Sequence, residues 1–285
     1  MRVRNIIVNA DDLGLSPSVN TAIFEVFRAG NLNSATVMAN MPGTADAVER
    51  LAVHKGLAVG LHFCLTEGYA LTGVSSITGQ DGGFMDRGTL WKAVLRGRVR
   101  ADDIRNEFEA QWQRMTSAGV GLTHVDSHQH VLMFPPVFKA LVPVLERLRL
   151  PVRVVEPPWR TVTADLVRPL RAAKQLMNVA FARMDRRLYT GPSNRQLVSV
   201  HDLAHTGPYS SATYLGLLER TSPEGVVEVM IHPYILGEDV LDLYRPVLDT
   251  KMPFLQRCVA EHAVLSQAPV FKEHHMVTFA DLVVP

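Results

Sequence analysis

Short apolar runs alternate with segments of helical periodicity along most of this 285-residue chain. The runs have the length and the β-branched residues typical of strands. Because a strand–helix–strand order is typical of parallel pairing, this alternation predicts an α/β fold with a parallel sheet. We expect strands at residues 5–10, 34–38, 57–65, 123–130, 151–155, 196–200 and 226–231. Residues 275–279 are expected either to close a barrel as an eighth strand or to pack outside it.

Three segments between the runs have recognisable local signals. Ser16 and Pro17 suit the N-cap and first position of a helix that ends near Gly30. Residues 101–118 form an amphipathic helical pattern. Residues 67–88 are rich in Gly, Ser and Thr and predict a long loop, which in compact domains is often a functional lid or binding segment.

Composition excludes several classes of protein. With 29 basic and 28 acidic residues the formal net charge is +1, so nothing indicates a nucleic-acid or anionic-membrane binder. No apolar run approaches the length of a membrane span. The chain reaches polar Asn9 and Asp11 too early for a signal peptide, and its two cysteines cannot form a disulfide framework. We therefore expect a cytoplasmic protein.

Two nucleotide-binding motifs are missing from the sequence. No GxGxxG follows the first expected strand, which argues against a dinucleotide-binding fold, and there is no P-loop. No Pro-, Gly- or Ser-rich linker divides the chain, so we expect residues 1–285 to form a single domain.

Four of the expected strands end in residues that bind metals or transfer protons. These are Asp11 and Asp12 after the first run, His62 in the third, His128 in the fourth and His232 after the seventh. In a parallel barrel the carboxyl ends of all strands open on the face that carries the active site, so these side chains are expected to meet. Each alone has a structural explanation, such as a helix cap or a buried hydrogen-bonded histidine. Their coincidence favours a functional site.

The run at residues 123–130 holds three of the 11 histidines and one carboxylate. In an extended strand alternate side chains share a face, so His124, Asp126, His128 and His130 are expected to point together. Convergent imidazoles and a carboxylate are costly to bury without a purpose. A divalent metal ion is the usual purpose.

At residues 9–14, 60–62, 65–66 and 123–130 the sequence resembles the YdjC-like family, which includes carbohydrate deacetylases that act on chitooligosaccharides. The match continues in order to residues 228–233 and so spans nearly the whole chain. The resemblance implies a distorted TIM-like (β/α) barrel with parallel strands and an active site at the carboxyl-terminal face. It also implies a divalent metal, hydrolysis of an N-acetyl group on a sugar, and often a homodimer.

The resemblance also assigns roles by motif position. It implies that Asp12, His62 and His128 bind the metal, that Asp11 is the catalytic base and that His232 is the general acid. One carboxylate would then be occupied by the metal while its neighbour remains free to take a proton. Imidazole ligands favour zinc, whereas a carboxylate with several waters also admits magnesium, so the expected cofactor is Mg or Zn.

Other polar residues near these motifs have less defined roles. His124 and Asp126 are expected to support the ligands, with Asp126 accepting a hydrogen bond from His128 or another group. His130 is expected either to reach the substrate or to line the mouth of the barrel. For His201 and His205, which lie in a polar stretch, a place in a substrate cleft and a purely structural role are both open.

Two departures from the family pattern affect the expected substrate contacts. Leu13 stands where the family usually has Phe, a mild apolar change. After the fifth expected strand the family commonly has a segment of Arg-Pro-Arg-Glu type, whereas residues 154–160 read Val-Val-Glu-Pro-Pro-Trp-Arg. A branch of the family is associated with hopanoid lipid biosynthesis, so a chitin fragment and another N-acetyl sugar are both open as substrates.

Two other functions compete with a deacetylase. A metal-dependent sugar isomerase or epimerase would also use a metal and a carboxylate base, but it normally needs more carboxylate ligands than this pattern offers. A catalytically silent sugar-binding barrel would keep the fold. The Asp11–Asp12 pair counts against the latter, since a binding module needs no free base beside a ligand.

Overall fold

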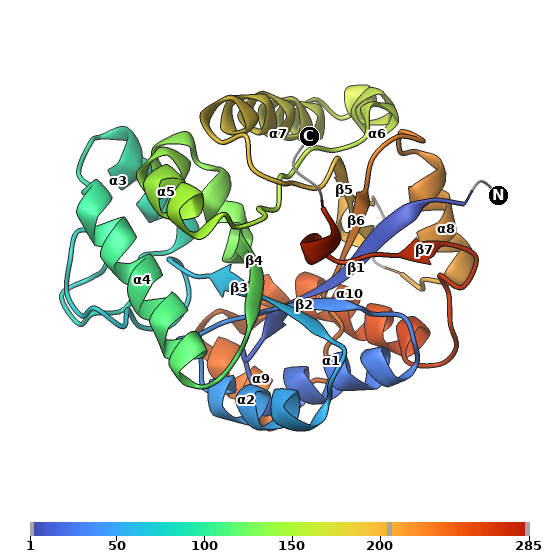
Figure 1. The fold of residues 1–285 in the computed structure, drawn as a ribbon, viewed down its shortest axis with the longest axis horizontal. Coiled ribbons are helices and arrows are strands. Elements are labelled where there is room, and N and C mark those ends of the chain that lie inside the picture. Colours follow the sequence, from blue (N-terminus) through green and yellow to red (C-terminus); the bar gives the residue numbers. More distant parts are fainter. Residues whose placement is uncertain (1–2, 204–206, 283–285) are drawn as a thin grey trace.

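The strands of the chain form one sheet in which they pair in parallel. The computed structural model describes residues 3–203 and 207–282. Strand order is β4-β3-β2-β1-β6-β5, and β7 pairs with the start of β1. The strands are β1 Asn5–Leu13, β2 Ser34–Val37, β3 Ala58–Phe63, β4 Leu122–Ser127, β5 Gln196–Val198, β6 Val227–Ile231 and β7 His275–Met276. Figure 1 shows this sheet curled into a half-barrel within a layer of helices, which confirms the expected distorted α/β barrel.

Helices surround the sheet on its outer side. They are α1 Pro17–Arg28, α2 Thr44–Val53, α3 Arg87–Leu95, α4 Ala101–Ser117, α5 Pro135–Leu148, α6 Trp159–Ala164, α7 Pro169–Leu188, α8 Ser211–Glu219, α9 Glu238–Tyr244 and α10 Leu248–Leu265. In Figure 1, α4 and α5 lie beside β3 and β4, whereas α1 and α10 lie beneath β1 and β2. Every residue of β6 is buried, because strands of a covered parallel sheet face protein on both sides. Among the described helices, none has the length and apolar character needed to cross a membrane.

The first helix begins where its sequence signals predict. The Ser16 hydroxyl accepts a hydrogen bond from the Val19 N–H, and Pro17 occupies the first turn. The helix ends at Arg28, and Gly30 follows with a φ of 75°, a left-handed conformation that glycine adopts at little cost.

Residues 151–155 do not form the expected fifth strand. Val152 makes isolated parallel bridges to Val125 of β4 and to Ser193 before β5. The Asn194 side chain accepts a hydrogen bond from the Val154 N–H (2.7 Å) and donates one to the Val154 carbonyl (3.0 Å). Because this side chain satisfies groups that a neighbouring strand would otherwise pair, the segment spans the gap between β4 and β5 without being a regular strand.

The last described strand lies off the main path of the sheet. Within the described part of the chain, β7 pairs with β1 alone, at Asn5 and Ile6. The turn η5 (Phe279–Asp281) follows it, and the Phe279 ring stacks on His124 of β4 at 4.1 Å between centroids. Residues 275–279 therefore do not close the barrel as an eighth strand, and the alternative expectation, that they pack outside it, is the one that fits the structure.

The expected strand at residues 123–130 is shorter than its pattern suggests. β4 ends at Ser127, and the 3-10 turn η1 (His128–Met133) begins there. Gln129 and His130 have φ values of 52° and 58°, a left-handed conformation uncommon for residues other than glycine. The alternation of strand side chains therefore stops before His128, so the expected shared strand face covers His124 and Asp126 but does not extend to His128 and His130.

The predicted loop at residues 67–88 leads into α3 at Arg87 and is held against α4. Glu107 of α4 accepts hydrogen bonds from the Leu71 N–H (3.1 Å) and the Thr72 N–H (3.0 Å). At the start of the loop, Oε2 of Glu67 lies 3.7 Å from Nε2 of His128. The loop therefore reaches the carboxyl end of the sheet.

Candidate active site

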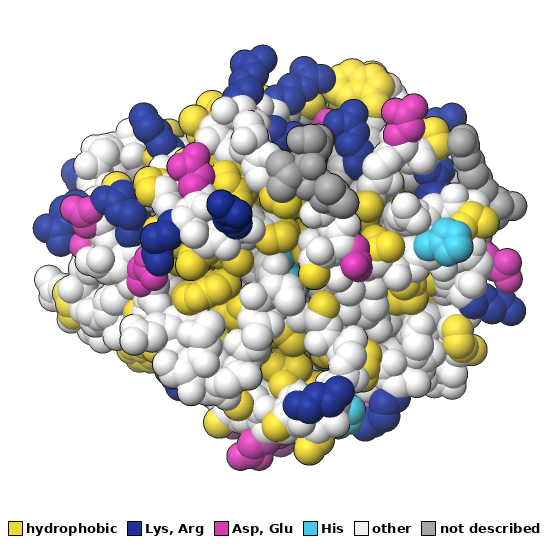
Figure 2. Space-filling view, viewed as in Figure 1, with side chains coloured by type: hydrophobic (Ala, Val, Ile, Leu, Met, Phe, Trp, Pro, Cys, Tyr) yellow, Lys and Arg dark blue, Asp and Glu magenta, His cyan; other side chains and the backbone are white. Residues whose placement is uncertain are grey.

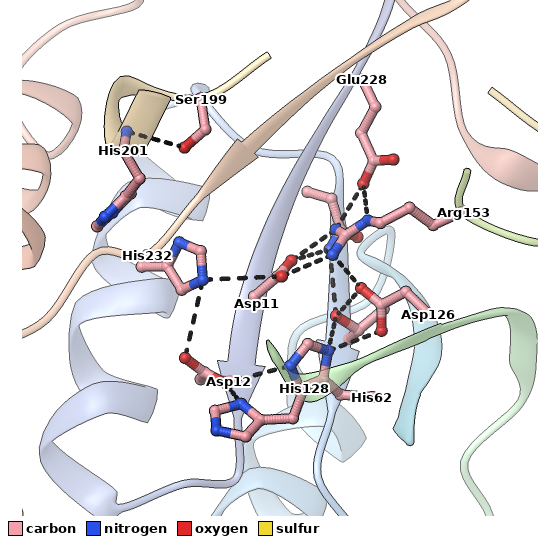
Figure 3. A network of polar contacts seen from close by, with 12 residues as sticks. Asp11, Asp12, His62, Asp126, His128, Arg153, Ser199, His201, Glu228 and His232 are labelled. Carbon is pink, nitrogen blue, oxygen red and sulfur yellow. Dashed lines mark hydrogen bonds and ion pairs between the residues drawn. The ribbon is translucent and has the colours of Figure 1, made fainter. Parts of the chain in front are cut away.

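Side chains from three strand ends meet at the carboxyl edge of the sheet. Oδ1 of Asp12 lies 3.2 Å from Nε2 of His62 and 2.9 Å from Nδ1 of His128. All three residues are buried, and their donor atoms lie within 4.8 Å of one another. Asp12 comes from β1, His62 from β3, and His128 directly follows β4 (Figure 3). The structure thus brings together the three residues that the motifs single out as ligands.

Asp11 and Asp12 are consecutive, yet both carboxylates point into this site (Figure 3). In a regular strand neighbouring side chains point to opposite faces. The register of β1 against β2 shifts between Ala10 and Leu13, and Asp12 has a φ of 67°. A β-bulge with one left-handed residue redirects a side chain in this way. The bulge is therefore the backbone feature that places a second carboxylate beside the first.

The donors at this site suit a divalent metal ion. Two imidazoles and one carboxylate are the ligand types of a catalytic zinc site with open positions. Nε2 of His128 is buried and makes no hydrogen bond of normal length among the described residues, although Oε2 of Glu67 lies 3.7 Å away. The Tyr234 hydroxyl donates a 2.6 Å hydrogen bond to Oδ2 of Asp12. This bond helps to fix the orientation of the Asp12 carboxylate. The residues therefore fit the expected metal, and they do not distinguish zinc from magnesium.

Arg153 binds three buried acidic side chains at once. Its guanidinium donates two 2.6 Å hydrogen bonds to Asp11 and a 2.7 Å hydrogen bond to Glu228. The same group lies 2.6 Å from Oδ2 of Asp126 (Figure 3). Burial alone would raise the pKa of Asp11, but the charge and hydrogen bonds of Arg153 outweigh it and hold that pKa well below its usual range. Asp11 is therefore an ionised carboxylate in a fixed orientation.

The charge of Glu228 is only partly stabilised by Arg153. Its side chain is fully buried, and burial raises its pKa to about 7 although Arg153 opposes the shift. One guanidinium does not fully offset the burial of three carboxylates, and the pKa of Glu228 therefore stays raised.

Asp126 supports His62 rather than His128. Oδ1 of Asp126 accepts a 2.7 Å hydrogen bond from Nδ1 of His62, and its Oδ2 accepts one of 2.9 Å from the Thr36 hydroxyl. Burial disfavours the imidazolium, but the negative charge of Asp126 and the carboxylate of Asp12 together raise the pKa of His62 to about 10. This contact fixes Nδ1 as a donor and directs Nε2 toward Asp12.

His232 approaches the carboxylates from β6, on the far side of the site. Its Nε2 lies 3.8 Å from Oδ2 of Asp11 and 4.0 Å from Oδ2 of Asp12 (Figure 3). Burial, followed by the nearby charge of His201, lowers its pKa. The ring therefore faces both carboxylates without a direct hydrogen bond to either.

The remaining polar residues of the run are not part of the donor set. His124 is buried between Phe279 and Gly60, and burial lowers its pKa to about 3, so it is a neutral residue packed inside the barrel. His130 lines a cavity of about 70 Å³ together with Lys174 and other residues. His205 lies outside the described residues.

Three important residues of the site were not singled out from the sequence. They are Arg153, the buried Glu261 and Tyr234. Arg153 stands within an apolar run, and Glu261 falls at a buried position of α10 beside Cys258 and Leu265. A charged residue on an apolar face was the signal that could have identified both, because such residues are rarely buried without a partner.

The charged side chains on one face of the molecule are of both signs. On the face seen in Figure 2, Lys and Arg side chains are spread among acidic ones, in keeping with the net charge of +1. Nothing on this face resembles a continuous basic surface.

Comparisons with known proteins find relatives that are named as deacetylases. A carbohydrate deacetylase from Geobacillus stearothermophilus is 43% identical over 168 residues, 58% of this chain and 66% of that one. A carbohydrate deacetylase from Brevibacillus brevis is 31% identical over 285 residues, 97% of this chain and 99% of that one. A chitooligosaccharide deacetylase from Yersinia pestis is 30% identical over 242 residues, 83% of this chain and 84% of that one.

A solved structure shows the same fold. It is a protein from Enterococcus faecalis that is named as a candidate cellobiose-phosphate cleavage protein. It superposes with a TM-score of 0.74 over 98% of each chain at 19% sequence identity. At this identity the likeness concerns the fold alone.

The family comparison covers most of the chain. The model of the YdjC-like protein family matches residues 5–270. This range includes Asp11, Asp12, His62, His128 and His232. Together with the relatives that align over nearly the full length, the match shows that this chain belongs to the YdjC-like protein family.

Proposed function

We propose that this protein is a metal-dependent carbohydrate deacetylase, which hydrolyses the N-acetyl group of an acetylated amino sugar or oligosaccharide and releases acetate. The observation that carries the proposal is the position of Asp11. It is an ionised carboxylate held by Arg153, beside a separate Asp-His-His donor set and 3.8 Å from His232. Relatives named as carbohydrate deacetylases support an enzyme that cleaves an amide bond.

The three donors of the site would hold the metal. Asp12, His62 and His128 supply one carboxylate and two imidazoles, which suits zinc and also admits magnesium. When bound, a divalent ion would lower the pKa of a water molecule and polarise the acetyl carbonyl. Tyr234 holds Asp12 in its orientation, and Asp126 holds His62 in the same way. The donor atoms are thereby oriented for a metal ion before it binds.

Asp11 acts as the general base in this proposal. Its carboxylate takes a proton from the water that attacks the acetyl carbon. Arg153 keeps the group ionised and fixes the direction of its oxygens by two hydrogen bonds. The left-handed Asp12 in the bulge brings the carboxylate of Asp11 next to the donor set, so that Asp11 can reach a water molecule that attacks an acetyl group bound there.

His232 acts as the general acid. A new C–O bond forms at the acetyl carbon, and the C–N bond breaks only if the sugar nitrogen receives a proton. Nε2 of His232 faces the two carboxylates from β6. A lowered pKa makes this ring a better proton donor when it is protonated. The products are acetate and the free amino sugar.

One experiment separates this proposal from its two competitors. Metal-loaded protein is incubated with N-acetylated chitooligosaccharides, and acetate and sugar products are measured. Acetate release supports the deacetylase, whereas an isomeric sugar without acetate would favour an isomerase or epimerase. Binding without any product would favour a sugar-binding protein.

Other expectations remain predictions. We propose that residues 1–285 act as one domain, that the protein forms a homodimer and that it works in the cytoplasm. Size-exclusion chromatography with light scattering tests the dimer, limited proteolysis tests the single domain, and cell fractionation tests the location.

A further inference from the structure

A second cluster of polar side chains lies next to His232, away from the donor set. At its centre is Glu261 of α10, whose side chain is fully buried. Oε1 of Glu261 accepts hydrogen bonds from Nε2 of His201 (2.9 Å) and from the backbone N–H of His232 (3.0 Å). Its Oε2 accepts one from the Tyr214 hydroxyl (3.1 Å). The carboxylate therefore ties α10, α8 and the turn that holds His201 to the end of β6.

His201 is held firmly by its surroundings. It lies in the turn η3 (Val200–Asp202), where its N–H donates to the Ser199 hydroxyl at 3.3 Å (Figure 3). Arg257 of α10 donates a 3.1 Å hydrogen bond to the His201 carbonyl. The ring packs against Phe254 at 5.1 Å between centroids. Ring and backbone are thus fixed to the same helix that carries Glu261.

The His201 ring in turn packs on His232. The two imidazoles form a T-shaped contact with centroids 4.8 Å apart, and Phe254 packs edge-on against His232 at 5.6 Å. Nδ1 of His232 is buried and has no hydrogen-bond partner among the described residues. The orientation of this ring is therefore set by its anchored backbone and by the two aromatic contacts, and not by a hydrogen bond to Nδ1.

We propose that Glu261 and His201 are positioning residues that hold the His232 ring toward the reacting centre. This inference rests on the proposed function, in which His232 protonates the leaving nitrogen. A donor misplaced by a fraction of an ångström to an ångström loses much of its contribution to the rate. Neither residue touches the donor set, so their effect is confined to the step that needs the acid.

The test compares two substrates that differ in their leaving group. Cleavage of an N-acetyl sugar needs a proton on the nitrogen, whereas para-nitrophenyl acetate releases a stable phenolate that needs none. We expect Glu261→Gln and His201→Gln to lower kcat for diacetylchitobiose about tenfold or more, with KM changed less than about twofold. Hydrolysis of the phenyl ester and the bound metal content should stay near the wild-type values.

The chain offers a matched control on the same helix. His262 follows Glu261 on α10 and pairs with Glu25 at 2.8 Å near the surface. His262→Gln and Glu25→Gln remove the same chemical groups from a His–Glu pair outside the site. We expect both variants to keep the wild-type kcat on both substrates.

Four outcomes would overturn the inference. Unchanged kcat on the amide would show that neither residue acts through His232, and an equal loss on amide and ester would indicate a general structural defect. Since His201, His232 and Glu261 also have donor atoms within 4.8 Å of one another, a second bound zinc lost in His201→Gln would make the cluster a metal site instead. A wild-type protein that releases no acetate from any N-acetyl sugar would contradict the proposed function, and the inference with it.

Discussion

The guanidinium of Arg153 meets the carboxylate of Asp11 through two parallel hydrogen bonds of 2.6 Å each. Such bidentate pairs fix direction as well as charge. Both residues are 2% exposed, so water screens the contact little. Arg153 therefore determines whether Asp11 is ionised and which way its oxygens point.

The first prediction concerns Asp11. Asp11→Asn keeps the size of the side chain and removes the base, so acetate release should fall about 100- to 10,000-fold. Bound metal should stay at the wild-type content, because Asp11 is not among the three donors. Kinetic assays and elemental analysis of the same preparation check both statements. Near-full activity of the variant would show that another group takes the proton.

The second prediction concerns the stability that Arg153 provides. Arg153→Met leaves three buried carboxylates without their cation, and we expect the free energy of unfolding to fall by about 3–5 kcal/mol. Adding Glu228→Gln should recover part of the loss, since one of the three charges is then removed. Denaturant unfolding of both variants gives the values.

The control for this prediction is an exposed ion pair. Arg147 of α5 pairs with Glu109 of α4 at the surface. Arg147→Met should change the free energy of unfolding by less than about 1 kcal/mol. If Arg153→Met cost no more than Arg147→Met, the buried network would not stabilise the fold.

The third prediction follows from the raised pKa of His62. In the metal-free protein this pKa is about 10, so the ring carries a proton at neutral pH. Metal binding at Nε2 must displace that proton, and the affinity should therefore rise with pH until the pKa is passed. Titration calorimetry in buffers of different ionisation enthalpy should show about one proton released per ion, or more if His128 also loses one. An affinity that is constant between pH 6 and 8 would contradict the assignment of His62.

The fourth prediction concerns the packing inside the barrel. A Cβ at Gly60 would lie 2.5 Å from the His124 ring, which is itself stacked on Phe279. Gly60→Ala should therefore lower the free energy of unfolding by about 1–3 kcal/mol. Gly121, before β4, has no atom within 4 Å of such a Cβ, so Gly121→Ala is the control and should unfold like the wild type. Equal stability of the two variants would show that His124 moves aside freely.

The parallel pairing of the strands and the place of the site could be predicted from the sequence. Apolar runs that end in Asp12, His62 and His232 needed only the rule that parallel strands open their carboxyl ends on one face. The structure brings these side chains together at that face. Local periodicity and the residue types at the strand ends were sufficient to predict that these side chains meet.

Backbone irregularities could not be predicted in the same way. Periodicity assigns Asp11 and Asp12 to opposite faces, and only a register shift with a left-handed Asp12 brings them together. The same holds for the left-handed Gln129 and His130, which end the alternation after Ser127. Such conformations depend on tertiary contacts that offset local strain, so a sequence pattern does not reveal them.

The partners of the site residues were also missed for a physical reason. Arg153 and Glu261 lie far along the chain from Asp11 and His232, and their pairing depends on how the segment at residues 151–155 and helix α10 pack. A buried charge in an apolar run indicates that a partner exists. It does not say which residue that partner is.

The most direct test of the site is to locate the metal. Crystals grown with zinc would be measured at the zinc absorption edge, and the anomalous peak would be assigned to its neighbours. We expect one strong peak about 2.0–2.2 Å from donor atoms of Asp12, His62 and His128, with Asp11 left unbound beside it. A peak at His201, His232 and Glu261 alone, or a peak bound by Asp11, would contradict the division of the two aspartates into ligand and base.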